Sequence, residues 1–253
     1  MRLDRMIAVR NDKTSYRDGE YCMKVFVNSH TKSEIFAEAL NQARAEETGL
    51  PVPKLCEVTM LDGKWTIVSE LIRGMSLEQI SRGEPEKRKA ILDAFIDLQL
   101  EVQSKKCGLF PKLSEKLRRE IAAADFDGGL REVLMRRLDE LTSLPGEDCL
   151  CHGDFALSNV ISSERGLYIL DWSHASTGSA AADAARTYLL FWLAGEIDGA
   201  ERYLSGFSAK SGISARLIKR WMPLAAASQM KRCRFTQREF LLGWVKDNKF
   251  KGE

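Results

Sequence analysis

The first 70 residues combine short alternating apolar runs with frequent turns, a pattern typical of a small sheet. A turn signal at Arg17-Asp18-Gly19 precedes residues 21–27, where aromatic and β-branched side chains predict a strand. Residues 31–48 carry apolar side chains at helical spacing, so we expect a helix there. Gly49 ends that pattern, as glycine commonly does just after the last turn of a helix.

Two further strands are expected at Leu55–Leu61 and Lys64–Ser69. The Asp62-Gly63 pair between them is a strong hairpin signal, because both residue types tolerate the positive φ angles of a tight turn. From residue 85 onward helical periods dominate, with a short β-rich interruption at residues 150–172. The pattern therefore predicts an α+β chain with a small N-terminal sheet and a larger, mainly helical remainder.

A chain of 253 residues is long enough for one large domain or two closely joined lobes. The change from sheet to helix favours two lobes, one over residues 1–72 and one over residues 73–253. We expect a hinge between them near Glu70–Gly74. Ligands commonly bind in clefts between lobes, so we expect a ligand-binding site near the hinge.

The net charge of +2 and the hydrophobic fraction of 44% exclude a disordered chain and disfavour a nucleic-acid partner. The start of the chain is charged, and no segment reaches the roughly 18 apolar residues that span a bilayer. We therefore expect a cytoplasmic protein without a membrane partner. The charge is uneven: from Ala215 to the end there are ten Lys or Arg and three Asp or Glu, a local charge of +7.

Three oxygen-bearing side chains fall around a predicted hairpin. Asn159 precedes its first strand and Asp171 follows its second, so the hairpin places these two side by side. Asp154 comes five residues before Asn159, in the loop that leads in. Magnesium prefers oxygen ligands, which Asn159 and Asp171 could supply, while Asp154 could accept a proton from an attacking hydroxyl. This arrangement suits phosphoryl transfer.

These residues form the pattern His152-Gly153-Asp154, four residues, Asn159, and then a strand ending in Asp171-Trp172. The pattern resembles the catalytic and metal-binding loops of the aminoglycoside phosphotransferase and choline kinase group, which has the bilobal fold of protein kinases. The resemblance implies a protein-kinase-like fold, ATP as phosphate donor with GTP as the alternative, and Mg²⁺. It also implies that Asp154 is the base and that Asn159 and Asp171 are the metal ligands.

The resemblance extends into the N-terminal lobe. Lys24, in Met23-Lys24-Val25, looks like the strand lysine that binds the α- and β-phosphates, and Glu38 looks like its ion-pair partner. The run Ser69–Gly74 resembles the hinge of the group, which implies nucleotide contacts from Glu70 and Ile72. Nearly the whole chain is covered by the resemblance.

Two departures from the pattern bear on the substrates. Residues 11–19 lack a Gly-x-Gly-x-x-Gly loop, so Lys13–Tyr16 would cover a triphosphate with hydroxyls, such as that of Ser15, and with backbone amides. Only about eight residues separate Asp171 from the expected helix near Ser179–Asp183, which is too short for the activation segment of a protein kinase. Both this and the Gly at position 153, where protein kinases have Arg, favour a small-molecule acceptor.

The acceptor hydroxyl could belong to a sugar, an amino alcohol or an aminoglycoside-like compound. If the +7 segment faces the acceptor pocket, a neutral or anionic acceptor is easier to accommodate than a polycationic drug; if it faces water, this argument disappears. The alternative from another class is a catalytically weak nucleotide-binding or scaffold protein on the same fold. The oligomeric state is expected to be a monomer or a homodimer.

Overall fold

The structure is a computed structural model that describes residues 5–9, 13–27, 30–106, 108–146 and 148–246. Residues 11 and 12 of the segment expected to cover a triphosphate and residues 247–253 of the +7 segment lie outside the described residues. The chain forms two compact units. The first comprises Met1–Lys87 and Leu157–His174, and the second comprises Arg88–Ala156 and Ala175–Glu253.

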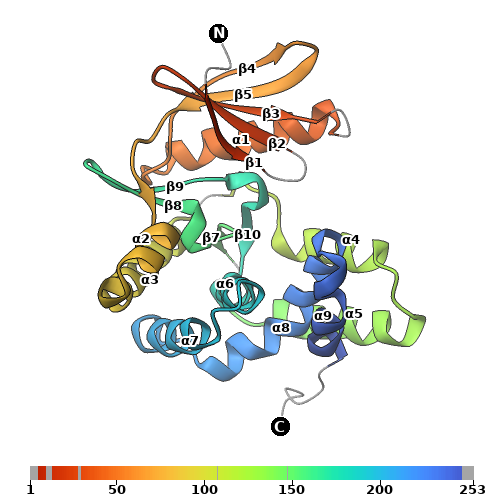
Figure 1. Ribbon diagram of the computed structural model, residues 1–253. Helices are drawn as coiled ribbons and strands as arrows, with labels where there is room; N and C mark the ends of the chain where they lie inside the picture. Colours follow the sequence, from red (N-terminus) through yellow and green to blue (C-terminus); the bar gives the residue numbers. More distant parts are fainter. Residues whose placement is uncertain (1–4, 10–12, 28–29, 107, 147, 247–253) are drawn as a thin grey trace. The chain divides into compact units, whose positions relative to one another are not determined.

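The first unit is built on a five-stranded antiparallel sheet in the order β1-β2-β3-β5-β4 (Figure 1). Its strands are β1 (Arg5–Val9), β2 (Lys13–Asp18), β3 (Tyr21–Phe26), β4 (Leu55–Leu61) and β5 (Lys64–Glu70). The Asp62-Gly63 turn joins β4 to β5 with both residues at positive φ, 48° and 74°. This is the geometry that an Asp-Gly hairpin turn requires, so the predicted hairpin is confirmed.

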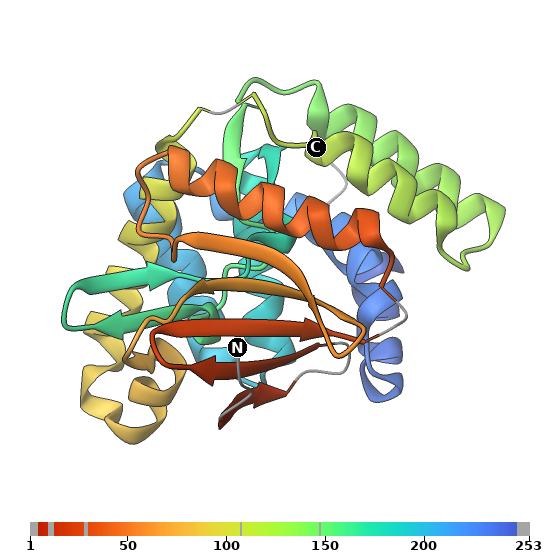
Figure 2. The ribbon, with the colours of Figure 1, turned by 90° about the horizontal axis from the view of Figure 1, so that it is seen from above.

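Helix α1 (Lys32–Glu47) runs along one face of this sheet (Figure 2). Thr31 and Glu34 form a reciprocal capping box at its start, which satisfies backbone N–H groups that would otherwise lack partners. The core between helix and sheet consists of Phe26, Ile35, Ala39 and Ile67. The helix predicted over residues 31–48 is therefore confirmed, and its packing fixes α1 against β3 and β5.

A smaller three-stranded sheet completes the first unit. It contains β6 (Met75–Ser76), β8 (Val160–Ser163) and β9 (Gly166–Ile169) in the order β6-β8-β9. The helical segments of this part are α2 (Leu77–Gly83), η1 (Pro85–Lys87), η2 (Leu157–Asn159) and η3 (Trp172–His174). The strands β8 and β9 are the hairpin predicted around Asn159 and Asp171.

The second unit is mainly helical. Its helices are α3 (Arg88–Ser104), α4 (Leu113–Ala123), α5 (Gly128–Thr142), α6 (Ala180–Leu193), α7 (Ile197–Ser211), α8 (Ala215–Gln229) and α9 (Arg238–Lys246), with the short turns η4 (Met230–Arg232) and η5 (Phe235–Gln237). The two-stranded sheet of β7 (Cys149–Cys151) and β10 (Ser176–Gly178) lies among them. Helix α6 is buried along most of its length and contacts both α7 and α8.

The architecture confirms the predicted fold class, a small antiparallel sheet with one main helix followed by a mostly helical remainder. One expectation was wrong: Lys13–Asp18, treated as part of a covering loop, is strand β2, because its backbone pairs with β3 along its whole length. The contacts also group residues 73–87 with the N-terminal sheet. The functional boundary after residue 72 stays a prediction. Within the described residues, no helix is both long and apolar enough to cross a bilayer.

Candidate active site

In the first unit, three of the predicted residues meet in one ionic cluster. Lys24 on β3 places its Nζ 2.5 Å from Glu38 Oε1 on α1 and 3.6 Å from Asp171 Oδ1 after β9. The cluster is largely shielded, since the three side chains are 20%, 11% and 10% exposed. The strand lysine and helix glutamate are therefore paired as expected, and the hairpin aspartate joins them.

Lys24 remains a cation in this position. Burial acts to lower its pKa, but the carboxylates of Asp171 and Glu38 outweigh burial and hold the pKa above the ordinary range of lysine. A charged ammonium with two fixed carboxylate neighbours is well placed to receive the phosphate oxygens of a nucleotide.

Asp171 adopts an unusual backbone conformation. Its φ is 63°, in the left-handed region that residues other than glycine rarely occupy. The Ser173 hydroxyl donates to its Oδ1 at 2.9 Å, which helps to orient the carboxylate. Such strain tends to occur where a side chain must be aimed in one direction. Here it aims Asp171 at the lysines of the sheet.

The hairpin brings Asn159 next to Asp171, as predicted. The Leu170 N–H donates to the Asn159 carbonyl at 2.8 Å, and Val160 pairs with Ile169 in the ladder. The Asn159 side chain is 2% exposed. One carboxylate and one amide oxygen form a donor set that suits magnesium, which usually completes its shell with phosphate oxygens and water. Among the described residues, no group of three or more His, Cys, Asp or Glu side chains is arranged to hold a metal.

A second lysine in this cluster was not anticipated. Lys13 on β2 lies 3.3 Å from Asp171 Oδ1 and 3.5 Å from Glu38 Oε1, and its side chain is 11% exposed. The sequence could have indicated which face of the sheet Lys13 occupies. The turn at Gly19-Glu20 sets Ser15 opposite Lys24 in the ladder between β2 and β3. Strand alternation then puts Lys13 on the same face as Ser15.

Three other residues, Ser15, Glu70 and Ile72, are predicted to contact the nucleotide. Ser15 occupies the middle of β2, directly opposite Lys24. Glu70 ends β5, and its carboxylate accepts from Arg165 at 2.7 Å. Ile72 follows in the segment after β5, where it is half-buried. The nucleotide contacts of these three residues stay predictions.

Asp154 belongs to the second unit, in the loop after β7. His152 is fully buried and its Nδ1 accepts the Asp154 N–H at 3.2 Å, while Phe155 packs edge-on against the His152 ring. Arg186 on α6 donates to Asp154 Oδ1 at 3.4 Å and to the Gly153 carbonyl at 3.3 Å. His152 thus shapes the loop, and Arg186 is a further partner of Asp154.

Asp183 on α6 holds this loop through hydrogen bonds. Its Oδ1 accepts the Gly153 N–H at 2.8 Å, and its Oδ2 accepts from the amides of Gln99 at 3.0 Å and Gln103 at 3.1 Å. Tyr203 in turn donates to Gln99 Oε1 at 2.6 Å. Burial, with the Asp183 charge as the next cause, raises the pKa of Tyr203 well above its ordinary value, so its hydroxyl stays a donor. The network holds the backbone next to Asp154 in one position.

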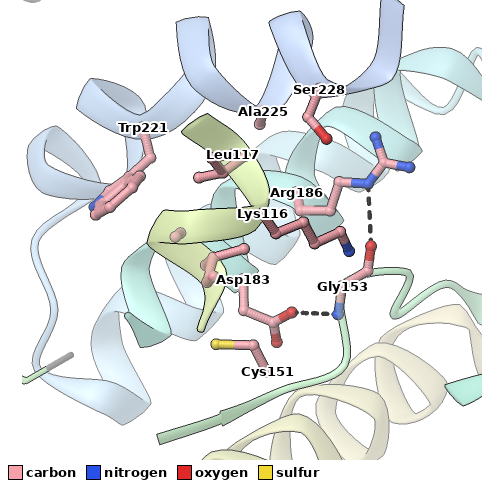
Figure 3. Close-up of a pocket in the computed structure, with 11 residues that line it drawn as sticks. Lys116, Leu117, Cys151, Gly153, Asp183, Arg186, Trp221, Ala225 and Ser228 are labelled. Carbon is pink, nitrogen blue, oxygen red and sulfur yellow. Dashed lines mark hydrogen bonds between the residues drawn. The ribbon is translucent and has the colours of Figure 1, made fainter. Parts of the chain in front are cut away.

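A small pocket of about 40 Å³ borders this loop (Figure 3). It is lined by Leu113, Lys116, Leu117, Cys151, Gly153, Ala182, Asp183, Arg186, Trp221, Ala225 and Ser228. Helix α8 contributes Trp221, Ala225 and Ser228, so no lining residue from the +7 segment is basic within the described chain. The charge argument based on that segment therefore finds no support at this pocket. Its cations come instead from Lys116 and Arg186.

The sequence matches the profile of the phosphotransferase enzyme family over residues 8–221. The chain belongs to this family. A comparison of this phosphotransferase with curated proteins finds no match.

Solved structures similar to this phosphotransferase include aminoglycoside and choline kinases. A thermostable mutant of aminoglycoside phosphotransferase APH(4)-Ia, in ternary complex with AMP-PNP and hygromycin B, is 17% identical, with 94% of this chain and 90% of that chain covered and a TM-score of 0.67. Aminoglycoside-3'-phosphotransferase of type VIII is 18% identical, with coverages of 88% and 93% and a TM-score of 0.66. Choline kinase LicA from Streptococcus pneumoniae is 15% identical, with coverages of 97% and 93% and a TM-score of 0.61. These likenesses show a kinase-like fold.

Proposed function

We propose that this phosphotransferase transfers the γ-phosphate of ATP, with magnesium, to a hydroxyl group of a small molecule. The observation that carries the proposal is the buried cluster of Lys24, Glu38 and Asp171 in the first unit. A shielded lysine that two carboxylates keep charged contributes little to the packing of a sheet. Its positive charge is, however, suited to binding phosphate. The AMP-PNP complex of a structural relative supports a nucleotide as donor.

Magnesium would be held by Asp171 and Asn159. Bound there, it would supply positive charge that neutralises the phosphate oxygens. The chain itself positions these ligands: Ser173 orients Asp171, and the β8–β9 ladder fixes Asn159 at its start. Lys24 would bind the α- and β-phosphates, and Glu38 keeps its ammonium in place.

Asp154 would accept the proton of the acceptor hydroxyl as its oxygen attacks the γ-phosphorus and the bond to the β-phosphate oxygen breaks, releasing ADP. Arg186 and the Asp183 network fix the loop that carries this carboxylate. A positioned base contributes about 10²–10⁴-fold to the rate.

We infer that the acceptor is neutral or anionic, such as a sugar or a sugar phosphate. The pocket beside the Asp154 loop carries the cations of Lys116 and Arg186, and its one lining carboxylate, Asp183, is already bonded to three protein donors. A polycationic acceptor would find no open carboxylate among the lining residues, all of which lie in the described part of the chain.

The test is acceptor-dependent ADP release with ATP, with and without Mg²⁺, against a panel of neutral sugars, sugar phosphates, amino alcohols and aminoglycosides. Asp154→Asn is compared with wild type and with Asp148→Asn. Asp148 lies six residues before Asp154 in the same unit. It is an exposed carboxylate that pairs with Lys106, so it controls for loss of charge alone.

We expect Asp154→Asn to lose about 10²–10⁴-fold in turnover and Asp148→Asn to keep wild-type turnover. Wild-type turnover by Asp154→Asn on the best acceptor would show that another group is the base. ATP binding without transfer to any acceptor would favour the nucleotide-binding scaffold instead. Preferred turnover of an aminoglycoside would refute the neutral or anionic acceptor. The cytoplasmic location and the oligomeric state stay predictions.

A further inference from the structure

Two lysines, Lys13 and Lys24, contact the carboxylates of Glu38 and Asp171 in the first unit. Lys13 and Lys24 both lie within 3.6 Å of Asp171 Oδ1 and within 3.5 Å of Glu38 Oε1. The cluster thus contains two ammonium groups and two carboxylates. Lys13 is nearly buried, so its position reflects a built contact and not the random reach of a surface side chain.

The ladder between β2 and β3 fixes where Lys13 stands. Lys13 pairs with Phe26 and Ser15 pairs with Lys24, so both lysines project from the same face of adjacent strands. The Lys13 ammonium also lies 5.9 Å from the centre of the Phe26 ring. Pairing with Phe26 on β3 fixes the Lys13 backbone, and strand alternation directs its side chain to the face that carries the carboxylates.

The segment before β2 lacks the glycines that commonly let backbone amides wrap around phosphates. No glycine occurs between Asn11 and Asp18, and Lys13 is already in a regular strand whose N–H and C=O groups face neighbouring strands. A strand cannot form the concave nest of N–H groups that a glycine-rich loop offers. Within β2, the side chains are therefore the groups that can bind a triphosphate, and Lys13 supplies the positive charge among those that face the cluster.

We propose that Lys13, which contacts Asp171 in the structure, is a second phosphate-binding lysine that binds the triphosphate of the nucleotide. Asp171 would be one of the residues that hold magnesium, so the Lys13 ammonium would exchange this carboxylate for phosphate oxygens. The inference rests on the proposed ATP-dependent function and adds the residue that replaces the glycine-rich loop. It predicts that Lys13 recognises phosphate and not the nucleoside.

The competing role for Lys13 is structural. A lysine that only neutralises Asp171 and Glu38 would stabilise the cluster, and its loss would lower stability or disturb all ligands alike. Loss of a phosphate-binding lysine, by contrast, weakens the binding of ligands that carry phosphate and leaves the binding of other ligands unchanged. Comparing nucleotide with nucleoside separates these roles, because adenosine shares the base and ribose with ATP but carries no charge for Lys13 to meet.

The experiment measures the affinities of ATP and adenosine, each with Mg²⁺, by isothermal titration calorimetry. The full-length wild type is compared with Lys13→Met, Lys13→Arg and the control Lys64→Met. Lys64 starts β5 in the same sheet and is exposed, so its loss removes the same charge away from the cluster. In parallel, NMR of the lysine ammonium groups in wild type, assigned by comparison with Lys13→Arg, reports directly on Lys13 even if Lys13→Met fails to fold.

We expect Lys13→Met to weaken ATP binding by on the order of 10- to 100-fold, the range for one charge-assisted hydrogen bond. Adenosine binding should not change, Lys13→Arg should keep most of the ATP affinity, and Lys64→Met should match wild type. In the NMR measurement, ATP should shift the Lys13 resonance and adenosine should not.

Equal losses for ATP and adenosine would establish the structural role and overturn the proposal, as would unchanged ATP binding or a Lys13 resonance that ignores ATP. If wild type transfers phosphate while Lys13→Met binds ATP normally, this inference alone falls. If wild type binds no nucleotide, the proposed function falls and takes this inference with it.

Discussion

Asp183→Asn tests whether a buried carboxylate holds the loop that carries Asp154. Asp183 is 2% exposed and accepts from Gly153, Gln99 and Gln103. Asparagine keeps the volume and one oxygen, so the Gly153 bond can survive. Its amide group, however, turns two donor hydrogens toward the amide donors of Gln99 and Gln103.

The cost follows from which of these groups can adapt. Gln99 is fully buried and its oxygen accepts from Tyr203, so rotating its amide would break that bond. Gln103 is only part-buried and can turn toward water. One unsatisfied buried donor costs about 1–3 kcal/mol, and losing the charge-assisted character of the other bonds adds to it. We expect the free energy of unfolding to fall by about 3 kcal/mol.

The assay is urea unfolding, together with hydrogen exchange at the Gly153 amide and turnover on the best acceptor. Asp97→Asn is the control, because Asp97 is exposed and pairs with Lys210 on the surface of the same unit. We expect Asp97→Asn to keep the wild-type urea midpoint. If Asp183→Asn unfolds at the wild-type midpoint and its Gly153 amide exchanges no faster, the network does not hold the loop and the reasoning is wrong.

Two other changes have outcomes that follow directly from the structure. A Cβ on Gly74 would lie 2.0 Å from the Ser162 carbonyl oxygen, so Gly74→Ala should cost about 1–3 kcal/mol in urea unfolding, whereas Gly83→Ala, with open space around it, should be neutral. Equal stability of the two variants would contradict this. Burial, followed by the hydrogen bond to Glu201, raises the pKa of Tyr188 from 10.0 to about 12. Between these pH values the folded protein binds more protons than the unfolded chain, so this contribution is complete below pH 10 and is lost as pH rises to 12. Urea midpoints of Tyr188→Phe should therefore decline less steeply over that range, and parallel declines would refute the assignment.

Local patterns explain why much of the fold was predictable. The capping box at Thr31 and Glu34 and the Asp62-Gly63 turn act over a few residues, so they mark α1 and the β4–β5 hairpin in any context. The position of Asn159 beside Asp171 also follows locally, since one short hairpin separates them. Strand β2 was missed because its polar residues lack an apolar period, and its place in the sheet comes from pairing on both sides.

The sequence by itself determined helix α1, the β4–β5 hairpin, the hairpin of the expected metal ligands and the resemblance that led to the family. Each of these depends on neighbouring residues or on motifs of fixed spacing. The tertiary structure alone decided that Lys13 joins Asp171 across 158 positions and that Gln99 supports Asp183 across 84. Such contacts depend on strand register and on which helix faces meet in the core, and no local spacing encodes them. Helix packing also decided the charge of the candidate pocket. Lys116 and Arg186 line it, whereas the basic residues of α8 do not.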